Sequence, residues 1–272
     1  MKRLPRRARR RTGEGGEVTT PSERALVWSY GGGVQSAAIA VLVVQGRLPR
    51  PERIVMADTG REATLTWDYL RNYIQPYLAT VGLTVEIAPH SLASVDLFSE
   101  SGDRRPMIPL YNSGGGRLPN FCSTEWKRRV VSRWCRAEGY PPSKRVEWLG
   151  ISTDEIHRAH PGPGVVYPLL DLVPMPRVAC SLLVISAGLP QPPRSSCWMC
   201  PFRSPGEWRS LKERGDGDWE RAVALDRELR TFDVYEQTHY LHRSMKPLDE
   251  VDLGDDSQGV LFDVCEEGRC EF

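Results

Sequence analysis

Cys197 and Cys200 are separated by two residues in the stretch SSCWMCPF. This spacing lets both sulfur atoms of a tight turn point at one centre, and thiolates are favoured ligands of zinc and of iron–sulfur clusters. Thioredoxin-type redox pairs share the spacing. Those pairs follow an early strand, however, whereas this pair follows the loop segment QPPRSS. The motif therefore indicates a metal or cluster site.

A site of four thiolates needs two further donors. The chain has seven cysteines and no apolar secretion signal, which argues against a disulfide framework. Cys122 lies where a loop meets an expected helix, and Cys265 and Cys270 lie near the C-terminus. Two arrangements are open. One is a structural zinc ribbon made of the CxxC pair, Cys265 and Cys270. The other is a cluster held by Cys122, Cys197 and Cys200, with its fourth position open or filled from the tail.

Of the other two cysteines, Cys135 and Cys180, the second lies in an apolar stretch. Free cysteine behaves as a small hydrophobic residue, so both are expected to fill core space.

The glycine-rich stretch YGGGVQS is a second candidate site. An apolar run over 25–30 precedes it and a small-residue apolar run over 36–44 follows it, which predicts a strand, a glycine loop and a helix. In that geometry backbone N–H groups and a helix N-terminus converge on one point, which suits a phosphate. A βα turn without a ligand has the same pattern, and no lysine follows to complete a Walker P-loop. The candidate nucleotide-binding residues of this loop are Gly31, Gly32, Gly33, Gln35 and Ser36.

Asp58, Thr59 and Gly60 directly follow the next apolar run, at 53–57. Open α/β sheets bind ligands at the carboxyl ends of their strands, so these residues are candidates for the same nucleotide site. Asp58 is in addition a candidate Mg²⁺ ligand, with a helix-capping role as the alternative.

The order of apolar runs predicts an α/β fold with a doubly wound, mostly parallel sheet and a helical, cysteine-containing C-terminal region. Strands are expected at 25–30, 53–57, 83–89 and 145–152. Helices are expected at 36–44, 62–78 with Pro76 as a break, 124–137, within 174–189, at 206–214 and at 219–230.

Charge is unevenly distributed, although the formal net charge is only +1. Residues 1–11 carry seven basic side chains and no acidic one, whereas 248–272 carry nine acidic residues and one arginine. The basic segment is expected to be a solvated arm, and it is a candidate contact for tRNA or another nucleic acid. No apolar run reaches the length of a membrane span, so we expect a cytoplasmic protein without a membrane partner. A homodimer is compatible with the sequence.

The chain is expected to divide into four parts. Residues 1–22 form a disordered Arg-rich arm, 23–175 a nucleotide-binding α/β domain, 176–247 a helical Cys-motif region and 248–272 an acidic Cys-containing tail.

Taken together, these motifs resemble the PP-loop, or adenine nucleotide alpha hydrolase-like, superfamily. Within it they resemble the phosphoadenosine phosphosulfate (PAPS) reductase-like family of phage and actinobacterial type. The loop GGGVQS blends the family's two loop patterns, and ADTGRE is similar to its second-strand motif. GISTDE matches a further segment, with Ser152 where the family has arginine. CSTEWK matches the family's cysteine segment at Cys122 and Lys127, with Ser123 in place of a second cysteine.

The missing second cysteine makes the pattern similar to the three-cysteine tRNA thiolases of the superfamily. The resemblance implies an ATP-dependent sulfur-transfer enzyme that adenylates its substrate, releases pyrophosphate and inserts sulfur with the help of a [4Fe-4S] cluster. Lys127 and Arg128 are then the candidates for stabilising the leaving phosphates.

Two alternatives stay open. In the first, a thiol reductant supports reduction of PAPS or adenylyl sulfate (APS) to sulfite, with Cys265 or Cys270 as the attacking thiolate. In the second, the chain is a nucleotide-binding protein with a structural zinc site and no turnover.

Overall fold

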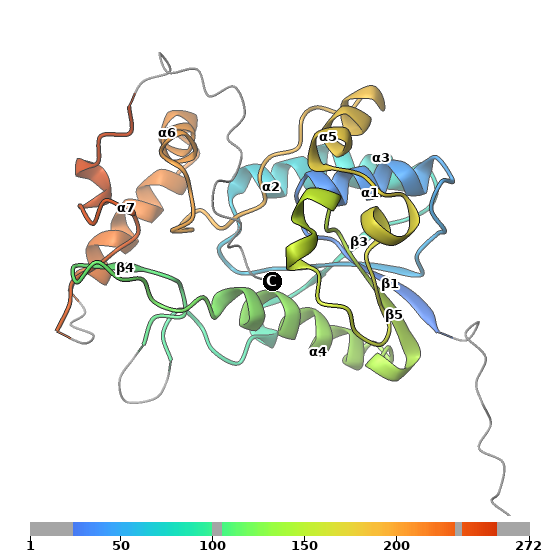
Figure 1. The fold of residues 1–272 in the computed structure, drawn as a ribbon, viewed down its shortest axis with the longest axis horizontal. Coiled ribbons are helices and arrows are strands. Elements are labelled where there is room, and N and C mark those ends of the chain that lie inside the picture. The colour runs from blue at the N-terminus through green and yellow to red at the C-terminus, as the bar shows by residue number, and fades with distance from the viewer. Residues whose placement is uncertain (1–23, 100–104, 232–235, 255–272) are drawn as a thin grey trace, which may run out of the picture.

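A five-stranded parallel sheet forms the centre of the larger lobe (Figure 1). The computed structural model describes residues 24–99, 105–231 and 236–254. The strand order is β3-β2-β1-β5-β6, and every neighbouring pair is parallel. The strands are β1 (Ala25–Ser29), β2 (Arg53–Ala57), β3 (Val85–Ala88), β5 (Arg145–Leu149) and β6 (Val165–Val166). The predicted α/β class with a mostly parallel sheet is confirmed.

Helices follow the strands in alternation, as parallel connections require. The α-helices are α1 (Val34–Val44), α2 (Thr64–Tyr69), α3 (Gln75–Ala79), α4 (Arg129–Ala137), α5 (Arg177–Ser186), α6 (Pro205–Arg214) and α7 (Asp218–Leu229). Shorter helical segments are η2 (Leu70–Ile74), η3 (His90–Leu92), η4 (Ser123–Arg128), η5 (Pro142–Lys144), η6 (Thr153–Arg158), η7 (Pro168–Leu172) and η8 (Leu248–Glu250). None of the helices in the described ranges is both long and apolar enough to cross a bilayer.

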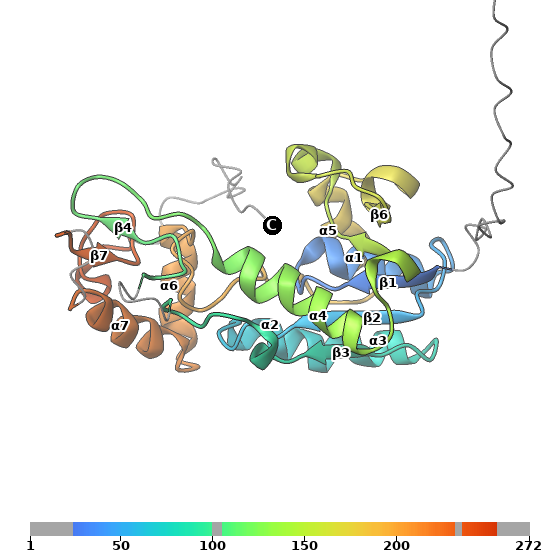
Figure 2. The ribbon, with the colours of Figure 1, turned by 90° about the horizontal axis from the view of Figure 1, so that it is seen from below.

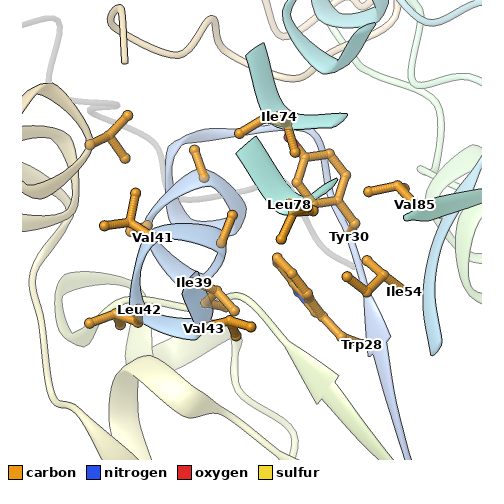
Figure 3. Close-up of a cluster of buried hydrophobic side chains, with 14 of the residues drawn as sticks. Trp28, Tyr30, Ile39, Val41, Leu42, Val43, Ile54, Ile74, Leu78 and Val85 are labelled. Atoms are coloured by element: carbon orange, nitrogen blue, oxygen red, sulfur yellow. The ribbon is translucent and has the colours of Figure 1, made fainter. Parts of the chain in front are cut away.

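One face of the sheet packs on α1, α3 and α5. Helix α1 is buried over nearly its whole length, and its own small and branched apolar residues occupy every side of the helix. Trp28 and Ile54 extend from the strands toward Ile39 of α1 and Leu78 of α3 (Figure 3). Cys180 of α5 belongs to this core and is fully buried, as expected for a space-filling cysteine.

The opposite face of the sheet packs on α4 (Figure 1). Val130 and Trp134 of this helix contact a cluster that includes Val27 and Val55, whose side chains point away from the first core because strand residues alternate between faces. Cys135 is fully buried there. Because helices cover both faces, the sheet is doubly wound as predicted.

The helix expected over 62–78 does not break at Pro76. Its first turn begins at Thr64, and the chain stays helical to Ala79. The π-helical turn Leu70–Ile74 precedes the proline, and Pro76 itself lies in the first turn of α3. The wider turn absorbs the missing N–H, so the proline is accommodated without ending the helix.

A second, smaller core lies at the other end of the molecule (Figure 2). It combines α6 and α7 with the segment that leads into η4, and β4 (Tyr111–Asn112) pairs there with β7 (His239–Tyr240). The largest fully buried side chains in this core are Trp126, Met199, Trp208, Ile108 and Leu110. Helix α5 packs on α1 in the first core.

Asp218 at the start of α7 ties the second core to the sheet lobe. Its carboxylate is fully buried and accepts hydrogen bonds from the backbone N–H of Thr64 at 2.8 Å and from the Thr64 hydroxyl at 3.0 Å. Arg221 pairs with the same carboxylate. A buried carboxylate with these partners fixes the position of α7 against α2.

Candidate nucleotide and thiol site

The glycine loop leaves β1 at the carboxyl edge of the sheet, as predicted, and Gly32 is its tightest point. Gly32 has φ of +78°, a conformation that side chains rarely adopt. A Cβ atom at this position would lie 2.8 Å from Cγ2 of Thr66 and 3.1 Å from Oγ of Ser195. Only glycine therefore fits here, both for its backbone and for the space around it.

The N-terminus of α1 opens onto this loop. Gly33 is the N-cap residue, and no side chain caps the helix. The hydroxyl of Ser36 is not a cap, because it accepts a hydrogen bond from the Gly31 N–H at 2.8 Å and so shapes the loop. Uncapped N–H groups at a helix start, next to glycine backbone, are a favourable place for a phosphate.

Gln35 joins the loop to the segment that follows β5. Its amide donates hydrogen bonds to the hydroxyl of Ser152 at 3.2 Å and to the carboxylate of Glu155 at 2.9 Å. Ser152 is completely buried. The Gln35 amide therefore already has protein partners and lines the loop. These contacts also place the GISTDE segment beside the glycine loop.

The DTG motif forms a turn at the end of β2. The carboxylate of Asp58 accepts the N–H of Gly60 at 2.7 Å, so Asp58 closes this turn. The helix-capping alternative for Asp58 is wrong, because α2 begins only at Thr64. Thr59 is fully buried, and its hydroxyl lies 3.5 Å from the sulfur of Cys197. This contact joins the DTG turn to the CxxC motif.

The segment that carries the CxxC motif lies directly on the glycine loop and the DTG turn. Glu62 and Cys197 form an isolated antiparallel bridge, and the N–H of Trp198 donates to the carbonyl of Arg61 at 3.0 Å. Ser195 supplies the side chain that approaches both Gly32 and Gly33. Residues 133 or more positions apart in the chain thus build one site at the sheet edge.

The CxxC residues themselves form a tight turn. The N–H of Cys200 donates to the carbonyl of Cys197 at 3.1 Å. The buried guanidinium of Arg203 donates to the same carbonyl at 3.0 Å and lies over the ring of Trp208. Backbone and arginine contacts therefore hold this turn.

Cys122 joins these two thiols from the start of η4. Burial, together with the neighbouring thiols of Cys197 and Cys200, raises the pKa of the Cys122 thiol to about 12. Burial, with the charge of Glu62, likewise raises the pKa of Cys197 to about 12. The thiol of Cys122 donates to the side chain of Asn120 at 3.1 Å. All three cysteines predicted as ligands therefore meet in one region beside the nucleotide loop.

The thiols are neighbours, but they do not converge on a single point. Across the described ranges, no group of three or more His, Cys, Asp or Glu side chains is arranged to hold a metal ion. Cys122 and Cys197 form no disulfide.

Lys127 faces the same region and pairs with Glu62. Its Nζ lies 3.6 Å from Oε2 of the Glu62 carboxylate, which is almost completely buried. Burial lowers the pKa of Lys127, but the charge of Glu62 and the three thiols outweigh this effect and raise it. The ammonium group is therefore charged at neutral pH. Arg128, the other candidate for phosphate contacts, is exposed one position further along η4.

Sequence reasoning missed Glu62 and Ser195. Oγ of Ser195 donates to Oε1 of Glu62 at 2.9 Å, so the two side chains connect the glycine loop with Lys127. Glu62 ends the ADTGRE motif, and an acidic residue directly after a strand-end turn was the available signal. Cys265 and Cys270 lie outside the described residues, as does the Arg-rich arm.

Comparisons with known proteins give little further information. A scan against protein-family models finds no match, and a comparison with curated proteins finds none either. Among solved structures, the U34-tRNA thiolase NcsA from Methanococcus maripaludis with its [4Fe-4S] cluster aligns with a TM-score of 0.45 and 15% sequence identity. The alignment covers 76% of this chain and 71% of that chain. A similarity this distant carries no argument about the activity of the chain.

Proposed function

We propose that the chain is a PP-loop enzyme that uses ATP to adenylate a substrate and then inserts sulfur, with an iron–sulfur cluster held by Cys122, Cys197 and Cys200. One observation carries this proposal. The cysteine turn lies directly on the glycine loop, where Ser195 approaches Gly32 and Cys197 contacts the DTG turn. A nucleotide site and a thiol site in contact suit a reaction that uses both.

The glycine loop and the open N-terminus of α1 would hold the phosphates of ATP. Gly32 and Gly33 bring backbone N–H groups to the loop, whereas the N–H of Gly31 is already bonded to Ser36, and Lys127 adds a positive charge nearby. Asp58 and Thr59 line the adjacent strand end, where the rest of the nucleotide would lie. The carboxylate of Asp58 is also the candidate ligand for a Mg²⁺ ion that accompanies the phosphates.

The donor set fits an iron–sulfur cluster by its chemistry. Thiolates are the ligands of such clusters, and three neighbouring thiols leave one position for another ligand. When bound, the cluster would supply a coordination site for sulfide. The tail cysteines Cys265 and Cys270 are candidates for the fourth position. Zinc is the alternative occupant of the same thiols.

The chemistry of the first step is a substitution at phosphorus. An oxygen atom of the substrate attacks the α-phosphorus of ATP, the bond to the bridging oxygen breaks, and pyrophosphate leaves. Lys127 would neutralise the charge that develops on the leaving group, and Arg128 would reach it only from the exposed side of η4. In the second step sulfide attacks the activated carbon and AMP leaves, which completes the balance. The Arg-rich arm is the candidate contact for a nucleic-acid substrate such as tRNA.

Product analysis tests the proposal. The full chain is purified anaerobically and given ATP with a sulfide donor, or PAPS or APS with a thiol reductant. Release of pyrophosphate from ATP supports the proposal, whereas release of sulfite identifies the reductase alternative.

Three variants sharpen this result. Lys127→Met is expected to lower pyrophosphate release at least tenfold, on the scale of a lost charge contact in a transition state, and Cys197→Ser is expected to lose sulfur insertion. Cys135→Ser replaces a buried cysteine in the α4 core, away from the glycine loop, and is the control variant, expected to keep the activity. Absence of both products from ATP and from PAPS would instead support the non-catalytic zinc protein.

A further inference from the structure

Glu62 places a buried negative charge next to the proposed phosphate site. Its side chain is 1% exposed. Oε1 is anchored by the hydroxyl of Ser195, whereas Oε2 has no hydrogen-bond partner among the described residues. A buried carboxylate normally satisfies both oxygens. The oxygen without a hydrogen bond faces Lys127.

The contact between Glu62 and Lys127 is an ion pair without a close hydrogen bond. The Nζ–Oε2 distance is 3.6 Å, longer than the roughly 2.7–2.9 Å of charge-assisted hydrogen bonds. In the described part of the chain, Lys127 donates no hydrogen bond, and its side chain is 27% exposed. Its N–H donors are therefore available to an incoming anion, while its charge is already balanced by the carboxylate.

Two contacts hold the Glu62 carboxylate beside the ammonium group. The backbone of Glu62 is bridged to Cys197, and the hydrogen bond from Ser195 fixes its side chain. Ser195 in turn packs against Gly32 at the tightest point of the loop. A phosphate that arrives at the loop therefore meets a lysine whose counter-charge stays in place.

We infer that Glu62 is the counter-charge of the phosphate site. It acts through Lys127 and keeps the pair neutral, so that the enzyme binds pyrophosphate weakly enough to release it. Without the carboxylate, the site would carry a full positive charge in a poorly solvated place and would retain the anion. Glu62 is thus a positioning residue for Lys127 and sets the affinity for phosphate groups. This inference rests on the proposed function for its role in turnover, but its electrostatic part is independent of turnover.

Binding of inorganic pyrophosphate to the full chain tests the inference by isothermal titration calorimetry. E62Q keeps the size of the side chain and an oxygen that accepts from Ser195, but removes the charge. We expect E62Q to bind pyrophosphate on the order of tenfold tighter and K127M on the order of tenfold weaker, the effect of one unit charge a few ångströms away at intermediate dielectric. The double variant E62Q/K127M restores a neutral pair and is expected to return to within about threefold of the wild type.

E125Q is the matched control. Glu125 is also buried and pairs with Arg129 on the same helical segment, but it does not contact Ser195 or Lys127. E125Q should leave the affinity for pyrophosphate unchanged. A merely structural role of Glu62 would weaken binding in E62Q, because a disturbed site binds less well.

Several results would overturn the inference. Weaker or unchanged binding by E62Q would do so, as would equal tightening in E125Q or no detectable binding by any variant. If E62Q alone folds poorly, the pyrophosphate affinities of K127M and E62Q/K127M are compared instead. The inference requires the double variant to recover the binding that K127M loses. The proposed function fails in a different assay, when the wild-type protein releases no pyrophosphate from ATP. That result leaves the expected direction of the change in pyrophosphate affinity of E62Q unaffected.

Discussion

Replacement of Gly32 by alanine should destabilise the protein more than any other single methyl group added to the loop. The added Cβ would lie 2.8 Å from Cγ2 of Thr66, which is buried and β-branched, and within 3.3 Å of the Met56 side chain. The positive φ of Gly32 costs about 1 kcal/mol in an alanine. Overpacking against a stiff neighbour adds roughly 1–3 kcal/mol, giving a total of about 2–4 kcal/mol.

Gly46 offers the control for this variant. It has a similar φ of +70°, but a Cβ there would meet nothing within 4 Å. Gly46→Ala should therefore lose only about 1 kcal/mol. Urea unfolding of the two variants and the wild type measures the difference, and titration with ATP measures binding. The reasoning is refuted if Gly32→Ala is no less stable than Gly46→Ala, or if it binds ATP as well as the wild type does.

Two further predictions concern parts of the fold outside the site. Asp218→Ala should lower the free energy of unfolding by about 3 kcal/mol because it leaves Thr64 and Arg221 without their buried partner; a loss below about 1 kcal/mol in urea unfolding would contradict this. Burial raises the pKa of Cys180 from 9.0 to about 12, so the native state keeps a proton that the unfolded chain loses, and this stabilising contribution declines as pH rises from 9 toward 12. Cys180→Ala should cost stability at pH 7 through the cavity it leaves but show a flatter decline above pH 9, and urea midpoints at several pH values would refute the assignment if the two slopes were equal.

Much of the sheet lobe could be predicted because its strands and helices are short, continuous apolar runs. The run at 53–57 is both the predicted and the observed strand β2, since a parallel strand buried on both faces is apolar along nearly its whole length, here from Ile54 to Ala57. Helix α1 was equally visible, as were both ends of α6 and α7 within one residue. The three cysteines expected as ligands lie in one region with Lys127, but they are not arranged to hold a metal ion in the described part of the chain, so their role stays a prediction.

Other features depend on contacts between distant parts of the chain. The approach of Ser195 to Gly32 and its hydrogen bond to Glu62 join segments more than 130 positions apart, and no local pattern encodes them. The two-residue strands β4 and β7 are too short for periodicity to show. The continuous helix through Pro76 could not be predicted either, because a π-helical turn that accommodates proline has no clear sequence signature.

Metal and sulfide analysis of anaerobically purified protein tests the central claim most directly. The account predicts brown protein with iron and acid-labile sulfide near four of each per chain, about the content of one [4Fe-4S] cluster. Cys122→Ser, Cys197→Ser and Cys200→Ser should each lose most of the iron, whereas Cys135→Ser and Cys180→Ser should retain it. Stoichiometric zinc without sulfide, or iron content that does not depend on Cys122, would contradict the account.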